Sequence, residues 1–144
     1  VFVSRLQGID ANELYRHAIE QTGGHIYATS INKDLIGVPQ SMASPEMVDE
    51  AQQGKPVSGL RAYGSMTYAG FKSYLYAQLD RDDPRVVAAL DWIRHHWTLD
   101  RNPGMPESMN QQGLYYMYMT LGRALSAWGS TTLDLPDGTN VDWA

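Results

Sequence analysis

Apolar residues recur at helical spacing in three stretches of the second half of the chain. The first covers residues 65–79, which contain no proline, and the second covers residues 85–97, just after Pro84. The third covers residues 111–128 and is followed by Gly129. Steps of three and four residues between apolar positions predict an amphipathic helix in each stretch. The apolar stripes are Val86, Leu90, Ile93 and Trp97 in the second, and Leu114, Met117, Leu121, Leu125 and Trp128 in the third.

The remaining segments read as short helices joined by loops. Residues 1–7 are expected to end a helix, and residues 12–21 to form a short one that Gly23 stops. A proline at the first helical position predicts another helix from Ser44 to about residue 53, within a long loop over about residues 25–62. The tail contains a turn at Pro136-Asp137-Gly138 and no strand ladder is expected. The predicted fold class is therefore all-α.

The three predicted helices differ in their charge. Residues 65–79 and 111–128 carry few charges, together with several small residues and tyrosines, whereas residues 85–97 have a polar side. A helix with little polar surface is normally buried on most sides. This alternation predicts inner helices packed around an axis and an outer, amphipathic helix between them.

Composition narrows the class of protein. The chain has 144 residues, of which 43% are hydrophobic and 19% charged, and a net charge of −5. An ordinary apolar fraction with moderate charge excludes a disordered chain. The acidic balance argues against nucleic acid as a partner. The sequence contains no apolar run of about eighteen residues, which is the length needed to span a membrane. The chain has no cysteine, which excludes a disulfide scaffold.

Several short motifs lie within residues 61–129. They are Gly64-Ser65-Met66-Thr67-Tyr68-Ala69-Gly70-Phe71, Asp82-Asp83-Pro84-Arg85-Val86, Asp91-Trp92-Ile93, Asn102-Pro103-Gly104-Met105 and Gly113-Leu114-Tyr115-Tyr116. These motifs resemble the squalene cyclase and prenyltransferase repeat superfamily, in particular bacterial proteins that contain prenyltransferase or squalene-oxidase repeats. A weaker match joins Gln7 to the segment 23–27, where Tyr27 stands in place of the tryptophan usual in the repeat.

The resemblance implies an α/α toroid of inner and outer helix pairs. A closed toroid takes roughly 300 residues, so residues 1–144 are expected to form one partial repeat domain, about half a barrel. Neither end of the sequence reads as a natural boundary, so we expect a fragment whose apolar edges meet the remainder of the same toroid.

The segment Asp80-Arg81-Asp82-Asp83 matches the Asp-x-Asp-Asp pattern with which squalene-hopene-type cyclases protonate their substrate. Such an acid must stay protonated at neutral pH, which needs a raised carboxyl pKa. Here Pro84 and Arg85 follow the motif, and the arginines favour ionised carboxylates. We therefore predict that these residues cap a helix and do not catalyse, which leaves any catalytic residue of this chain unknown.

Metal chemistry is not expected either. Protein prenyltransferases of the resembling superfamily hold zinc with Asp, Cys and His, and this chain has no cysteine. Asp91 and His95 lie one helical turn apart, but two candidates on an outer helix are more typical of a surface charge pair. The sequence predicts no metal and no cofactor.

The tyrosines are the remaining candidates for a binding site. Aromatic rings line cavities that hold prenyl chains or stabilise cationic intermediates, although tyrosines also wedge between helices for packing alone. We expect a cavity for a hydrophobic, isoprenoid-class ligand and no catalysis by this segment. The alternative is a segment of a class II terpene cyclase, an isomerase, whose acid lies outside the chain. The predicted cavity-lining residues are Tyr63, Thr67, Gly70, Phe71, Tyr74, Tyr115 and Tyr118.

Overall fold

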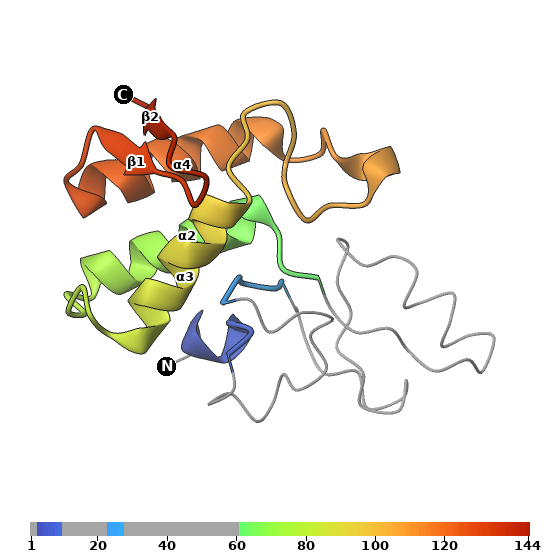
Figure 1. The fold of residues 1–144 in the computed structure, drawn as a ribbon. Coiled ribbons are helices and arrows are strands. Elements are labelled where there is room, and N and C mark those ends of the chain that lie inside the picture. The colour runs from blue at the N-terminus through green and yellow to red at the C-terminus, as the bar shows by residue number, and fades with distance from the viewer. Residues whose placement is uncertain (1–2, 10–22, 28–60) are drawn as a thin grey trace, which may run out of the picture.

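The computed structural model describes residues 3–9, 23–27 and 61–144, and Figure 1 shows their arrangement. The described elements are a 3-10 helix η1, three α-helices, a second 3-10 helix η4 and two short strands. Their bounds are η1 Val3–Leu6, α2 Gly64–Tyr76, α3 Pro84–His95, η4 Glu107–Met109, α4 Leu114–Trp128, β1 Thr132–Asp134 and β2 Asn140–Asp142.

The three helices predicted in the second half of the chain are confirmed to within about three residues at each end. Local chemistry sets two of their ends. The side chain of Asp83 accepts a hydrogen bond from the backbone N–H of Arg85, and Pro84 occupies the first position of α3. Gly129 ends α4 with a left-handed backbone, φ 78°.

The hydrophobic core lies between the three helices. α2 packs against both α3 and α4, so that it is the central helix of the described part. Both predicted apolar stripes face this core, with Val86 and Ile93 of α3 and Met117, Leu121 and Leu125 of α4 buried. Apolar side chains at these spacings place one face of each helix against α2.

The predicted all-α toroid is wrong. The described residues contain an antiparallel pair of strands, in which Leu133 of β1 lies opposite Val141 of β2, so the fold is mixed α and β. Leu133 is buried in the core, and the turn at Pro136-Asp137-Gly138 joins the strands. The hairpin is visible beside α4 at the C-terminal end of the chain in Figure 1.

The N-terminal segment lies against the other side of the helices. η1 contacts α2, and Gln7 directly after η1 forms an isolated antiparallel bridge with His25 (Figure 1). The helix expected to end within residues 1–7 is thus the single 3-10 turn Val3–Leu6. The helices predicted at 12–21 and from Ser44 lie outside the described residues, as does most of the predicted loop 25–62.

A buried asparagine fixes the start of α2 against the loop before α4. The Oδ1 of Asn102 accepts from the backbone N–H of Ser65 at 3.0 Å, and its Nδ2 donates to the Ser65 hydroxyl at 2.8 Å. The backbone N–H of Gly64 donates to the carbonyl of Pro103 at 2.8 Å. These bonds hold the beginning of α2 against the loop that precedes α4. None of the described helices is long and apolar enough to cross a membrane.

Candidate functional site

The seven predicted cavity-lining residues do not form one cavity wall. Thr67, Gly70, Phe71 and Tyr74 lie on the buried side of α2, whereas Tyr115 and Tyr118 lie on the exposed side of α4. Tyr63 precedes α2 and is half-buried. Because these side chains of α4 are exposed, the prediction that residues 111–128 are buried on most sides is wrong.

Two of the α2 residues hold the segment that contains His25. The backbone N–H of His25 donates to the hydroxyl oxygen of Thr67 at 3.0 Å, and that hydroxyl donates to the carbonyl of Tyr63. Gly70 lies directly under the imidazole, where a Cβ would collide with the ring. Glycine at this position therefore allows the close approach of His25 to α2.

Phe71 is part of the hydrophobic core. Its side chain is fully buried, and its ring lies 5.6 Å from the ring of Trp128, measured between centroids. An aromatic pair at this separation is typical of helix packing.

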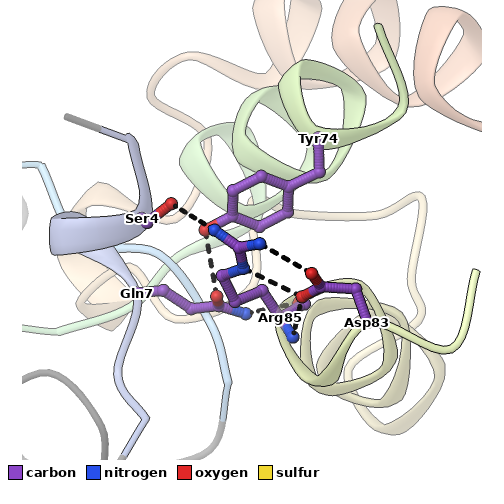
Figure 2. Close-up of polar contacts among 5 residues, drawn as sticks. All are labelled: Ser4, Gln7, Tyr74, Asp83 and Arg85. Carbon is purple, nitrogen blue, oxygen red and sulfur yellow. Dashed lines mark hydrogen bonds and ion pairs between the residues drawn. The ribbon is translucent and has the colours of Figure 1, made fainter. Parts of the chain in front are cut away.

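Tyr74 belongs to a hydrogen-bond chain that begins at Gln7 (Figure 2). The buried Nε2 of Gln7 donates to the carbonyl oxygens of Gly23 at 2.9 Å and Arg85 at 2.7 Å. Since carbonyl oxygens only accept, these two bonds fix which end of the Gln7 amide carries the nitrogen. The Oε1 of Gln7 must then accept, and it receives the hydroxyl proton of Tyr74 at 2.9 Å.

The direction of this chain determines the tautomer of His25. The Tyr74 hydroxyl donates its single hydrogen to the bond with Gln7, so its oxygen accepts a hydrogen bond from Nε2 of His25 at 3.0 Å. The imidazole therefore carries its hydrogen on Nε2. The buried Nδ1 atom then carries a lone pair, and no residue that the structure describes donates a hydrogen bond to it.

Burial governs the ionisation of both ends of this pair. It lowers the pKa of His25 to about 3, because a charged imidazolium here would lose its hydration. Burial likewise raises the pKa of Tyr74 to about 12. Gln7, His25 and Tyr74 are thus neutral at pH 7 and closed to solvent, so we interpret the cluster as a structural tie between the N-terminal segments and α2.

Arg85 links the same region to the start of α3. Its guanidinium forms a bidentate pair with the carboxylate of Asp83, with Nη2 2.6 Å from Oδ2 and Nε 2.8 Å from Oδ1 (Figure 2). Hydrogen bonds from Arg85 lower the pKa of Asp83 to about 2. The expectation that this acidic motif caps a helix is confirmed, since Asp83 is an ionised cap and Asp80 and Asp82 are exposed.

Three tyrosines and a methionine are exposed on α4. The exposed fraction is 89% for Tyr115, 47% for Tyr116, 36% for Tyr118 and 45% for Met119. The rings of Tyr115 and Tyr118 meet edge to face, with centroids 6.4 Å apart. The Tyr118 hydroxyl donates to the carbonyl of Leu99, which holds this ring in place on the helix.

Two further tyrosines continue this exposed area from other segments. Burial, with smaller contributions from the nearby Tyr27 and Tyr116 hydroxyls, raises the pKa of Tyr63 to about 12. Tyr27 is itself partly exposed. We call the resulting area the tyrosine surface, which consists of Tyr27, Tyr63, Tyr115, Tyr116, Tyr118 and Met119.

The proposed charge pair of Asp91 with His95 takes a different form. The carboxylate of Asp91 lies 3.8 Å from Nη1 of Arg94, and Nδ1 of His95 bonds the backbone carbonyl of Asp91 at 2.8 Å. Within the described ranges no three His, Asp or Glu side chains are grouped as metal ligands.

Sequence reasoning assigned no site role to Gln7 or His25. Their contacts join positions 16 or more residues apart, and the partners include backbone carbonyls, which leave no trace in local spacing. Comparison of the chain with protein families, with curated proteins and with solved structures gives no match.

Proposed function

We propose that this chain binds a hydrophobic ligand of the isoprenoid class on the tyrosine surface and that it does not catalyse a reaction by itself. The observation that carries the proposal is the exposure of Tyr115, Tyr116, Tyr118 and Met119 on one helix. The resemblance of the sequence to squalene cyclase and prenyltransferase repeats supports the choice of an isoprenoid.

The chemistry of the surface suits such a ligand. Tyrosine rings offer flat apolar faces, while their hydroxyls stay hydrated at the edge, so that a long hydrocarbon can bind without burying a charge. The half-exposed Met119 adds a flexible thioether that adapts to irregular apolar shapes. Contiguous exposed apolar side chains commonly mark binding sites.

A binding role is favoured over acid catalysis by the position of Asp82, the middle aspartate of the Asp-x-Asp-Asp pattern, to which the resemblance gives the role of the acid. Such an acid must be held in a site closed to water, whereas Asp82 is exposed in the turn before α3 and its neighbour Asp83 is ionised against Arg85.

The experiment is a calorimetric titration of the chain with farnesol, an isoprenoid alcohol, followed by the same titration of Tyr115→Ser. Tyr115 is almost fully exposed, so its removal is expected to leave the fold intact. Loss of the ring contact is expected to cost roughly 1–2 kcal/mol of binding free energy, which is about a five- to thirtyfold loss of affinity.

Tyr76→Ser is the matched control, because Tyr76 is an exposed tyrosine at the end of α2 far from the start of α4. It is expected to bind farnesol as the unaltered chain does. Equal weakening by both substitutions, or no binding by the unaltered folded chain, would refute the proposal.

A further inference from the structure

The outward face of α4 has the residue spacing of a second packing seam. Tyr115, Met119, Gly122 and Ser126 follow one another at steps of four, three and four residues. This is the spacing by which apolar positions face a neighbouring helix in a coiled coil. We call these four residues the outward seam.

The outward seam lies on the side of α4 that does not face the core. The core side is formed by Met117, Thr120, Leu121, Ala124 and Leu125, all of which are buried. A solvent-facing side normally carries several charges, but Arg123 is the single charged residue of α4. The composition of the outward face is therefore typical of a contact surface, and less typical of a face that meets only water.

Large and small side chains are separated along the seam. Tyr115 and Met119 stand exposed at its N-terminal half, whereas Gly122 and Ser126 form its C-terminal half. A Cβ built on Gly122 would meet no atom within 4 Å in the described part of the chain, so this position is an open depression on the helix. When a second copy of the helix runs in the opposite direction, the large side chains of each copy lie opposite the small residues of the other.

We propose that two copies of this chain pair through α4 in an antiparallel arrangement about a two-fold axis between residues 120 and 121. In this register Met119 of each copy lies over Gly122 of the other, and Tyr115 lies over Ser126 of the other. A two-fold interface requires such reciprocal contacts. Glycine at the central layer lets the two helices approach near the lower end of the usual range of about 8–10 Å.

Charge complementarity supports the same register. Tyr116 and Arg123 lie on one flank of α4, and a two-fold axis brings that flank of one copy against the same flank of the other. The guanidinium of Arg123 then lies beside the ring of Tyr116 of the second copy, where its charge meets the negative face of the ring. A parallel pair would place Arg123 beside the opposite flank of the second copy, away from Tyr116, and would lack this contact.

The pair is expected to be weak and reversible. α4 has 15 residues and is therefore roughly 22 Å long, which gives a contact below the size of a standard protein interface. Sedimentation of the 16.1 kDa chain at concentrations up to about 1 mM should show its mass rising toward twice that value. A chain that stays monomeric over this range would overturn the proposal.

Gly122→Leu tests the central layer. The open space around Gly122 accommodates leucine within one copy, so the fold is expected to persist, but the side chain fills the depression that receives Met119. We expect at least tenfold weaker pairing. Ala127→Leu is the matched control, since Ala127 is exposed on α4 outside the seam and its enlargement should leave pairing unchanged. Equal pairing of both variants, or equal weakening, would contradict the assigned face.

The orientation is tested by cysteine cross-linking, which is unambiguous because the chain has no cysteine of its own. Met119→Cys and Gly122→Cys are prepared as separate variants and oxidised alone and mixed. The antiparallel register predicts faster disulfide formation in the mixture, where the two sulfurs face each other. Faster cross-linking of either variant with itself would instead indicate a parallel pair and refute the register.

Pairing does not depend on the proposed ligand, because it is measured without one. The isoprenoid proposal and the pairing proposal can also be refuted independently of each other. Tyr115→Ser should weaken both farnesol binding and pairing, whereas Gly122→Leu should weaken pairing and leave the tyrosine rings available to farnesol.

Discussion

Acidification is expected to destabilise the protein through His25. The folded state holds this imidazole neutral, with a pKa of about 3, whereas an unfolded chain gives histidine its ordinary pKa of about 6.5. Between these two values the unfolded state binds a proton that the folded state does not. The contribution to stability is therefore complete above about pH 6.5 and is lost progressively as the pH falls toward 3.

The size of the loss follows from the two pKa values. A pH of about 4.5 is about two units below the pKa of histidine in the unfolded chain, so the unfolded state is protonated there. This protonation removes about 2.7 kcal/mol from the free energy of unfolding. The imidazole is almost completely buried, at 1% exposure, so solvent does not screen this term. The loss is a large fraction of the stability of an ordinary domain.

The assay is urea unfolding followed by circular dichroism between about pH 7 and pH 4.5. His25→Gln removes the titrating group while keeping a side-chain N–H for Tyr74, so its stability should fall by about 2.7 kcal/mol less than that of the unaltered chain over this range. His95→Gln, which replaces an exposed histidine, is the matched control and should retain the full loss. Parallel pH profiles for the unaltered chain and His25→Gln would refute the buried neutral imidazole.

Three further substitutions test the fold. Gln7→Glu should cost about 3 kcal/mol at pH 7 in urea unfolding, because a carboxylate cannot donate to two carbonyl oxygens; an unchanged midpoint would contradict the assigned amide orientation. Gly104→Ala should lower the melting temperature, with a cost of about 2 kcal/mol, since Gly104 has φ 87° and a Cβ would collide with the carbonyl of Ala62. Gln78→Gly should stabilise the chain by about 1 kcal/mol in the same melts, because Gln78 adopts a left-handed backbone at φ 58° after α2; a destabilised variant would argue against that conformation.

The helices could be predicted because their information is local. The stripe from Leu114 to Trp128 repeats at helical steps, and its buried members pack on α2 as the pattern requires. The end signals at Pro84 and Gly129 also act within one turn of the chain. Propensity and periodicity are sufficient where neighbours in sequence are neighbours in space.

The hairpin was missed although its signal is present. Leu133 and Leu135 alternate with polar residues before the turn, and Val141 and Trp143 alternate after it. Two alternating segments around a Pro-Asp-Gly turn are typical of a hairpin, but strands of three residues are too short to outweigh the helical pattern before them.

The cluster of Gln7, His25 and Tyr74 could not be predicted from spacing. Its members come from three segments, and two of the acceptors are backbone carbonyls, which every residue possesses. Only the three-dimensional arrangement shows that one amide, held by two carbonyls, sets the direction of every proton in the cluster.

α4 shows where the sequence rule fails and why the failure is informative. Its low charge predicted burial on most sides, which holds for Met117 and Leu125 but not for Tyr115 or Met119. A helix that is apolar on both sides gains stability from only one of them in a single copy, and the other side has an unfavourable contact with water. Natural sequences depart from such rules chiefly at sites that meet another molecule. Among the described residues, the outward face of α4 is therefore the part to which we assign both the proposed isoprenoid ligand and the proposed contact with a second copy.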